Sequence, residues 1–122
     1  TRLEGRTPVP EKESLDALAA HQATMAIYLS TGMIDRVAGI LQQAYGEEAP
    51  CAVVYQASQP GEKIIRTTLN KIAAELAREK ISRQAVIIVG RVLEVGLAQF
   101  RQHSKLYAAG FSHGFRSKTK PQ

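Results

Sequence analysis

Residues 85–90 read Ala-Val-Ile-Ile-Val-Gly, and this stretch indicates the fold more directly than any other part of the chain. Five consecutive apolar residues, four of them β-branched, predict a short buried strand that ends at Gly90. Because a strand of this kind is apolar on both faces, we expect helices to cover both sides of the sheet that contains it.

Three further strands are predicted upstream of this one. Residues 24–29 (Thr-Met-Ala-Ile-Tyr-Leu) and 51–55 (Cys-Ala-Val-Val-Tyr) are short apolar runs bounded by polar residues. Residues 63–69 mix isoleucine, arginine and threonine in a strand-like way, and the turn sequence Gln59-Pro60-Gly61 joins them to the preceding strand as a hairpin.

Helical patterns separate these strands. Apolar residues recur at helical spacing over residues 33–44, and Gly46 stands where that helix would end. Asn70 is expected to cap a second helix, and Ser14 a short one through Ala20. The predicted fold class is α/β, with a mixed sheet flanked by helices on both faces, because strands alternate with helices and one connection is a hairpin.

The composition of the chain excludes several classes of protein. With 122 residues it forms one domain at most, and its 44% hydrophobic residues argue against wholesale disorder. The apolar runs are too short to cross a membrane. A single cysteine, Cys51, excludes an internal disulfide framework and a cysteine-based zinc site, and it fits the reducing cytoplasm, where we expect the protein.

Positive charge is concentrated at the end of the chain. Residues 1–94 hold 11 basic and 11 acidic residues, whereas residues 95–122 hold five basic residues and no acid. Phe100, Tyr107, Phe111 and Phe115 lie among these charges, so the segment could bind nucleic acid by phosphate neutralisation and base stacking. We favour the alternative, a solvated tail whose aromatic residues pack against the domain, because a basic pI is common in proteins that bind no nucleic acid.

No catalytic motif stands out in the sequence. It contains neither a nucleophile elbow nor a phosphate-binding glycine loop, and the catalytic residues are unknown at this stage. His21, His103 and His113 are spaced too irregularly for a helical metal pair, so no metal site is expected. Cys51 begins an apolar strand and is interpreted as a small buried hydrophobic residue rather than a nucleophile.

Two loops at strand ends are more informative. Residues 29–31 leave the first predicted strand, and residues 56–60 leave the second. Ligands of open α/β sheets collect outside the carboxyl ends of strands, and the small residues Ala57 and Ser58 would allow a ligand close to the backbone. From spacing alone, ordinary connecting loops remain the favoured interpretation.

At these residues the sequence resembles the tetrapyrrole (corrin/porphyrin) methylase superfamily. The resemblance lies in the order and spacing of segments 1–10, 24–30, 52–60 (Ala-Val-Val-Tyr-Gln-Ala-Ser-Gln-Pro), 68–72 (Thr-Leu-Asn-Lys-Ile), 85–90, 104–107 and 111–113. The opening segment 1–10 and the closing segments 104–107 and 111–113 are most similar to the branch that methylates C11 of (cobalt-)precorrin-4 in cobalamin biosynthesis. The resemblance therefore implies an enzyme that transfers a methyl group from S-adenosylmethionine to a tetrapyrrole.

The resemblance also implies binding residues. In this family S-adenosylmethionine is expected in a cleft between two α/β domains. Carried over by position, the expected cofactor contacts are Leu29, Ala57, Ser58 and Ala85. Leu29 stands where relatives often have a methionine, so it keeps an apolar contact without the sulfur. Arg2 and Arg6 are the candidates for binding the acidic groups of the tetrapyrrole, a solvated linker being the alternative.

The glycine-rich motifs of the family's N-terminal domain do not occur in this sequence. We therefore expect residues 1–13 to be an interdomain segment, 14–116 a C-terminal methylase domain, and 117–122 a disordered basic tail. The expected partners are the tetrapyrrole substrate cobalt-precorrin-4, the missing N-terminal methylase domain and a second copy in a homodimer, with no membrane and no nucleic acid. The chain alone is expected to be inactive. The alternatives are another tetrapyrrole methylase, acting on uroporphyrinogen or another precorrin, and a small basic nucleic-acid-binding module.

Overall fold

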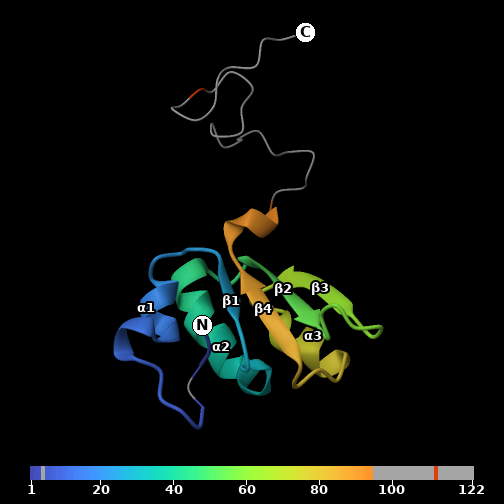
Figure 1. Cartoon of the computed structure of the whole chain (residues 1–122). Helices are drawn as coiled ribbons and strands as arrows, with labels where there is room; N and C mark the ends of the chain where they lie inside the picture. Colours follow the sequence, from blue (N-terminus) through green and yellow to red (C-terminus); the bar gives the residue numbers. More distant parts are fainter. Residues whose placement is uncertain (4, 95–111, 113–122) are drawn as a thin grey trace.

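A sheet of four strands packs against three helices in the computed structural model, which describes residues 1–3, 5–94 and 112 (Figure 1). The helices are α1 (Leu15–Ala19), α2 (Ile34–Tyr45) and α3 (Ile72–Arg78), and the strands are β1 (Met25–Ile27), β2 (Pro50–Tyr55), β3 (Lys63–Thr68) and β4 (Ala85–Val89). Short 3₁₀ turns occupy Glu11–Glu13 (η1), Thr31–Met33 (η2) and Arg91–Glu94 (η3). This confirms the α/β class and the predicted strands, whose ends shift by up to two residues.

The four strands do not form the mixed sheet that the sequence predicts, because their pairing directions are all antiparallel. The order is β1-β4-β2-β3, and each of the three pairings among these four strands is antiparallel. The crossover through α2 does make β1 and β2 parallel to each other, but β4 inserts between them, so the parallel strands are not neighbours. As a result, the carboxyl ends of β1 and β2 lie at the sheet edge where β4 begins.

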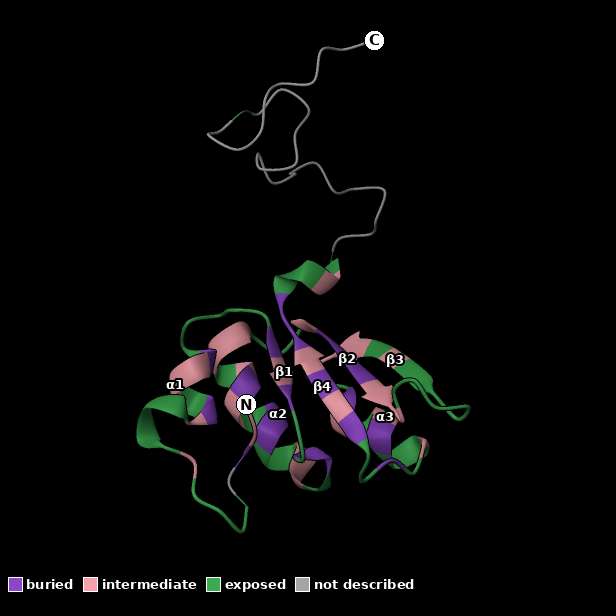
Figure 2. Cartoon of the chain, in the orientation of Figure 1, coloured by how far each residue is buried: buried purple, intermediate pink, exposed green. Residues whose placement is uncertain are grey.

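The expectation of helices on both faces is also wrong for the described residues. Side chains alternate between the two faces of a strand. Those of Ile27, Val53 and Ile87 point to the helices and are fully buried, together with Leu41 and Ile72 of the helices. The alternate residues form a second face, which is only partly buried in the described part of the chain. Its apolar members include Ala26, Val54, Ile64, Val86 and Ile88. Figure 2 shows intermediate and exposed stretches along the strands.

Two of the three residues that the sequence predicts to begin or end a helix do so in the structure. Ser14 caps α1 as predicted, because its hydroxyl accepts the Ala17 N–H at 3.2 Å. Gly46 ends α2 with φ +92°, a backbone conformation that favours glycine. Asn70, however, does not cap α3: its side-chain amide donates to Glu48 at 2.8 Å, and Lys71 takes the cap position without a side-chain hydrogen bond.

The first residues of the chain belong to the body of the sheet. Leu3 is only 6% exposed and joins the core, and Arg2 forms a parallel bridge with Tyr28 beside β1. Among the described residues, no helix has the length and apolar character that crossing a membrane requires. The predicted tail at 117–122 lies outside the described residues.

Candidate functional site

The sheet edge where β1 and β2 end and β4 begins has an unusual backbone. Leu29, Gln56 and Gln84 adopt φ values of +55°, +46° and +57°. Left-handed geometry costs a residue other than glycine about 1 to 3 kcal/mol, and such residues cluster at functional sites. The Gln56 N–H donates to the Gln84 carbonyl at 2.9 Å, and the two side-chain amides are hydrogen-bonded at 3.1 Å. These bonds hold the two loops together.

A cavity of about 410 Å³ opens at this edge. It is lined by Tyr28, Leu29, Thr31, Gly32, Ser82, Arg83, Gln84, Ala85 and Val86. Its volume lies within the range of roughly 300–1,000 Å³ found for small-molecule sites. Leu29 is 82% exposed and Tyr28 is 52% exposed, so the cavity has a large apolar rim. It is an open depression that a ligand could enter from solvent.

The buried hydroxyl of Ser30 explains why Leu29 points outward. Ser30 is completely buried, and its Oγ donates to the Tyr28 carbonyl at 2.7 Å and accepts the Leu3 N–H at 2.9 Å. With Ser30 anchored inside, the adjacent side chain of Leu29 turns toward solvent. Ser30 thus positions the cavity rim without lining the cavity, a role that the sequence pattern did not indicate.

The four predicted cofactor contacts are brought to the same edge but not into one cavity. Leu29 and Ala85 both line the cavity. Ala57 and Ser58 are exposed in the turn after β2, where the Ser58 N–H donates to a Glu62 carboxylate oxygen at 2.6 Å. Their proximity follows from the pairing of Tyr55 with Ala85, which places the turn next to the start of β4. Their contact with a cofactor stays a prediction.

Residues 82–84 were not among the predicted site residues. In a parallel sheet ligands collect at the carboxyl ends of strands, so the sequence pattern did not point to this segment. In this antiparallel arrangement the segment that enters β4 lies at the same edge. Arg83 therefore supplies the cavity with a cationic side chain that spacing did not indicate.

The two predicted substrate arginines differ in their surroundings. The Arg2 guanidinium donates through Nη2 to the Thr7 carbonyl at 3.0 Å and to the Thr7 hydroxyl at 2.7 Å. Arg2 also lies beside Tyr28, next to the cavity rim, through its backbone bridge. Arg6 is exposed in the same loop. Neither lines the cavity, and their role toward a substrate stays a prediction.

Cys51 is not a nucleophile. Its side chain is buried in β2, and burial raises the pKa of the thiol to about 12. The protonated form therefore prevails at neutral pH, and the prediction of a small buried hydrophobic residue is confirmed.

The residues that line the cavity at the ends of β1 and β2 can bind and orient a ligand through apolar contacts, backbone groups and one cation.

Comparison with known proteins identifies the family. Residues 2–73, more than half of the chain, match the Tetrapyrrole (Corrin/Porphyrin) Methylases. The chain belongs to this family. The predicted resemblance is therefore confirmed, and the cavity described above belongs to a methylase domain.

Individual methylases give a finer comparison. The chain is 50% identical over 121 residues to the cobalt-precorrin-4 C(11)-methyltransferase of Methanocaldococcus jannaschii, covering 98% of this chain and 46% of the relative. It is 40% identical over 123 residues to the enzyme of the same name from Priestia megaterium, covering 100% of this chain and 48% of the relative. The chain thus spans about half the length of the curated relatives it matches.

A solved structure shares the fold of this methylase domain. The X-ray structure of the cobalt precorrin-4 methyltransferase CbiF superimposes with a TM-score of 0.70 at 42% sequence identity. The match covers 75% of this chain and 39% of that chain. The sequence and structural comparisons thus point to the same group of proteins, and they do not favour a nucleic-acid-binding module.

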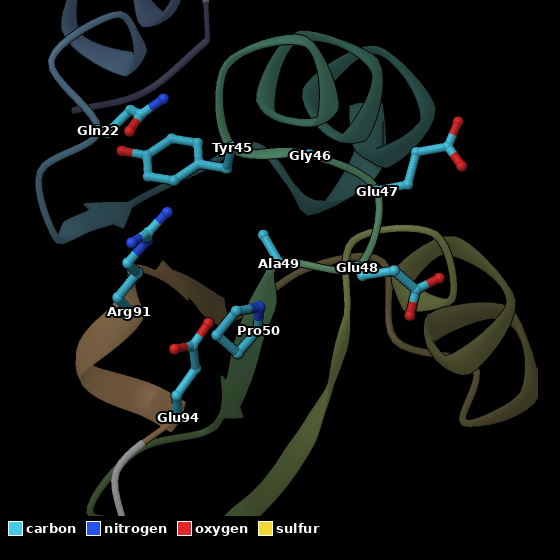
Figure 3. Close-up of a pocket in the computed structure, with 10 residues that line it drawn as sticks. Gln22, Tyr45, Gly46, Glu47, Glu48, Ala49, Pro50, Arg91 and Glu94 are labelled. Carbon is cyan, nitrogen blue, oxygen red and sulfur yellow. The ribbon is translucent and has the colours of Figure 1, made fainter.

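A second cavity of the methylase domain lies at the opposite edge of the sheet, where β4 ends and β2 begins. It measures about 500 Å³, and the side chain of Arg91 points toward those of Tyr45 and Gln22 (Figure 3). Two of its polar groups already bind the backbone: the Tyr45 hydroxyl donates to the Ala23 carbonyl at 2.5 Å, and the Gln22 amide donates to the Ala44 carbonyl at 2.8 Å. Burial raises the pKa of Tyr45. The Tyr45 hydroxyl and the Gln22 amide therefore hold the end of α2 in place. Because these two polar groups are already bound to the backbone, the first cavity is the candidate site.

Proposed function

We propose that the chain is the C-terminal part of an S-adenosylmethionine-dependent methyltransferase that methylates C11 of (cobalt-)precorrin-4 in cobalamin biosynthesis. The observation that carries this proposal is the 50% identity, over nearly the whole chain, to a cobalt-precorrin-4 C(11)-methyltransferase. The cavity at the sheet edge supports it, because the predicted cofactor contacts Leu29 and Ala85 line that cavity.

The cavity residues fit one wall of an S-adenosylmethionine site. Leu29, Ala85 and Val86 offer an apolar surface for the flat adenine ring, and the backbone of residues 82–84 offers hydrogen-bonding groups beside it. When bound, S-adenosylmethionine supplies a methyl group activated by a sulfonium centre. The hydrogen-bonded turns at Gln56 and Gln84 hold this wall rigid, so that the chain contributes orientation and exclusion of water.

The arginines near the cavity suit an anionic substrate. Precorrins carry acetate and propionate groups, and guanidinium groups bind carboxylates with two parallel hydrogen bonds. Arg83 borders the cavity, Arg2 lies beside Tyr28 at its rim, and Arg6 is exposed in the loop that follows Arg2. We propose that these side chains attract and position the macrocycle. The other proposed partners are the remaining half of the methylase and a second copy of the protein, in the cytoplasm.

Methyl-transfer assays with isotope-labelled S-adenosylmethionine and cobalt-precorrin-4 test the proposal. We expect transfer by the full-length methylase and none by this chain alone, because half of a shared cleft cannot hold donor and acceptor in line. Transfer to uroporphyrinogen instead of cobalt-precorrin-4 would correct the substrate, and absence of transfer to any tetrapyrrole would refute the proposal.

A matched pair of substitutions tests the site itself. Leu29→Glu places a charge on the apolar rim of the cavity, whereas Val92→Glu places the same charge on an exposed valine of η3, at the opposite edge of the sheet. In the full-length methylase we expect Leu29→Glu to weaken S-adenosylmethionine binding by at least about tenfold and Val92→Glu to leave it unchanged. Equal affinities of the two variants in calorimetric titration would contradict this placement of the cofactor.

A further inference from the structure

The loop between β2 and β3 folds into two consecutive β-turns. The Gln59 N–H donates to the Gln56 carbonyl at 3.0 Å, and the Glu62 N–H donates to the Gln59 carbonyl at 2.9 Å. Pro60 stands at the second position of the second turn, where its fixed φ is favourable. Together the turns bring Glu62 back beside Ser58, whose N–H donates to a Glu62 carboxylate oxygen at 2.6 Å.

Ser58 has a left-handed backbone at the third position of the first turn. Its φ is +64°, whereas Ala57 before it has a negative φ, which is the pattern of a type II turn. The third position of such a turn favours glycine. Rotation of the peptide between Ala57 and Ser58 by about 180° would give a type I turn, in which Ser58 has a negative φ. Serine by itself therefore favours the rotated form, and another contact must stabilise the form that the structure shows.

The Glu62 carboxylate supplies that contact. Because a trans peptide is planar, the Ala57 carbonyl and the Ser58 N–H point in opposite directions. The N–H points to Glu62, so the carbonyl points away from it. In the rotated form the carbonyl oxygen would face the carboxylate instead, and two acceptors repel each other. A hydrogen bond to a charged acceptor is also stronger than one between neutral groups, so Glu62 selects one orientation of this peptide.

We propose that Glu62 is a positioning residue for S-adenosylmethionine, because it directs the Ala57 carbonyl toward the cofactor. The inference rests on the proposed function, in which Ala57 contacts the cofactor. Ala57 is exposed, and among the described residues no donor binds its carbonyl, so the oxygen can accept a hydroxyl or amino group of the adenosyl part. The Gln56 N–H, bonded to the Gln84 carbonyl at 2.9 Å, keeps this turn beside the cavity that Gln84 lines.

Substitution of Glu62 in the full-length methylase tests the proposal. Without the carboxylate, the peptide populates both orientations, and the apparent dissociation constant rises as the competent fraction falls. We expect Glu62→Ala to raise the dissociation constant of S-adenosylmethionine about tenfold in calorimetric titration. Glu62→Gln keeps an oxygen acceptor, so its loss should be about threefold or less. Since Glu62 is exposed, the midpoint of urea unfolding should stay unchanged in both variants.

A second substitution separates positioning from direct contact with the cofactor. Ser58→Gly removes the cost of the positive φ, because glycine adopts this conformation readily. In the Ser58→Gly background, loss of the Glu62 carboxylate should therefore weaken binding by about threefold or less. A carboxylate that touched the cofactor would be missed equally in both backgrounds. Glu47→Ala removes the same charge from an exposed glutamate at the opposite edge of the sheet, and it should leave the affinity unchanged.

Nuclear magnetic resonance detects the orientation of the peptide directly. In a type II turn the Ala57 Hα lies close to the Ser58 N–H, whereas in a type I turn the N–H groups of the two residues approach each other. We expect the first contact to prevail in the unsubstituted methylase and the second to appear in Glu62→Ala. An unchanged contact pattern would overturn the proposal.

The binding measurements have separate outcomes for Glu62 and for the proposed function. Unchanged affinity in Glu62→Ala, or an equal loss of affinity with serine and with glycine at position 58, would overturn the positioning role alone. Absence of S-adenosylmethionine binding by the unsubstituted methylase would refute the proposed function, and the role of Glu62 with it.

Discussion

Ser30 shows how one buried hydroxyl shapes the site. It links Leu3 to the end of β1 and turns Leu29 outward. Replacement of Ser30 by alanine leaves the buried Leu3 N–H without its acceptor, so we expect the free energy of unfolding to fall by about 1 to 3 kcal/mol. Urea unfolding measures this, and Ser82→Ala, at an exposed serine, is the control. Equal stability of the two variants would mean that Ser30 does not anchor the turn.

Ala57 is a predicted contact of S-adenosylmethionine, although it does not line the cavity. In the full-length methylase, Ala57→Leu is expected to weaken S-adenosylmethionine binding at least about tenfold, because the larger side chain occupies space at the sheet edge. Since Ala57 is exposed, stability should change by no more than about 0.5 kcal/mol. Ala74→Leu on the exposed side of α3 is the matched control. Unchanged affinity in calorimetric titration would remove Ala57 from the site.

Between elements, an ion pair ties β3 to α3. The Lys63 ammonium lies 2.5 Å from a Glu79 carboxylate oxygen. Its hydrogen bond, followed by its positive charge, lowers the pKa of Glu79 below the ordinary value of 4.5. A carboxyl whose pKa is lower in the folded state stabilises the fold above pH 4.5, and that contribution disappears as the pH falls through the folded pKa. In the Glu79→Gln variant, the free energy of unfolding should therefore fall less between pH 7 and pH 3 than in the unsubstituted protein. Urea unfolding at about 50 mM salt measures this, and the difference should shrink at about 500 mM salt, which screens the ion pair. An identical profile for both proteins would show that the pair contributes nothing.

For the whole molecule, the partly buried second face of the sheet and the rim of the cavity predict self-association. Ile64, Tyr28 and Leu29 expose between 52% and 82% of their surface, and exposed apolar patches usually mark interaction sites. We expect analytical ultracentrifugation to detect dimers or larger species of this chain, with the monomer recovered on dilution. Leu29→Glu should reduce the association. A monomer at every concentration would contradict the prediction.

Local patterns in the sequence were sufficient to predict the elements. The apolar run at 85–89 predicted β4 with its correct bounds, and the turn at 59–61 predicted the β2–β3 hairpin. Helical spacing predicted α2, and Ser14 predicted the start of α1. Each of these depends on residues close together in the chain, whose periodicity and capping chemistry act over a few residues. The order of family segments likewise identified a tetrapyrrole methylase, since motif spacing is a property of the sequence.

The assembly of these elements depended on contacts between residues far apart in the chain. β4 inserts between β1 and β2, a choice made by long-range pairing that no local period encodes. That insertion makes the four strands antiparallel and brings residues 82–86 against residues 28–32, so it creates the cavity. The left-handed backbone of Leu29, Gln56 and Gln84 is likewise stable only because the surrounding hydrogen bonds compensate its cost. The sequence therefore specified the pieces and the family, whereas packing across the sheet specified where a ligand can bind, because that place is made of surfaces that meet only when the chain is folded.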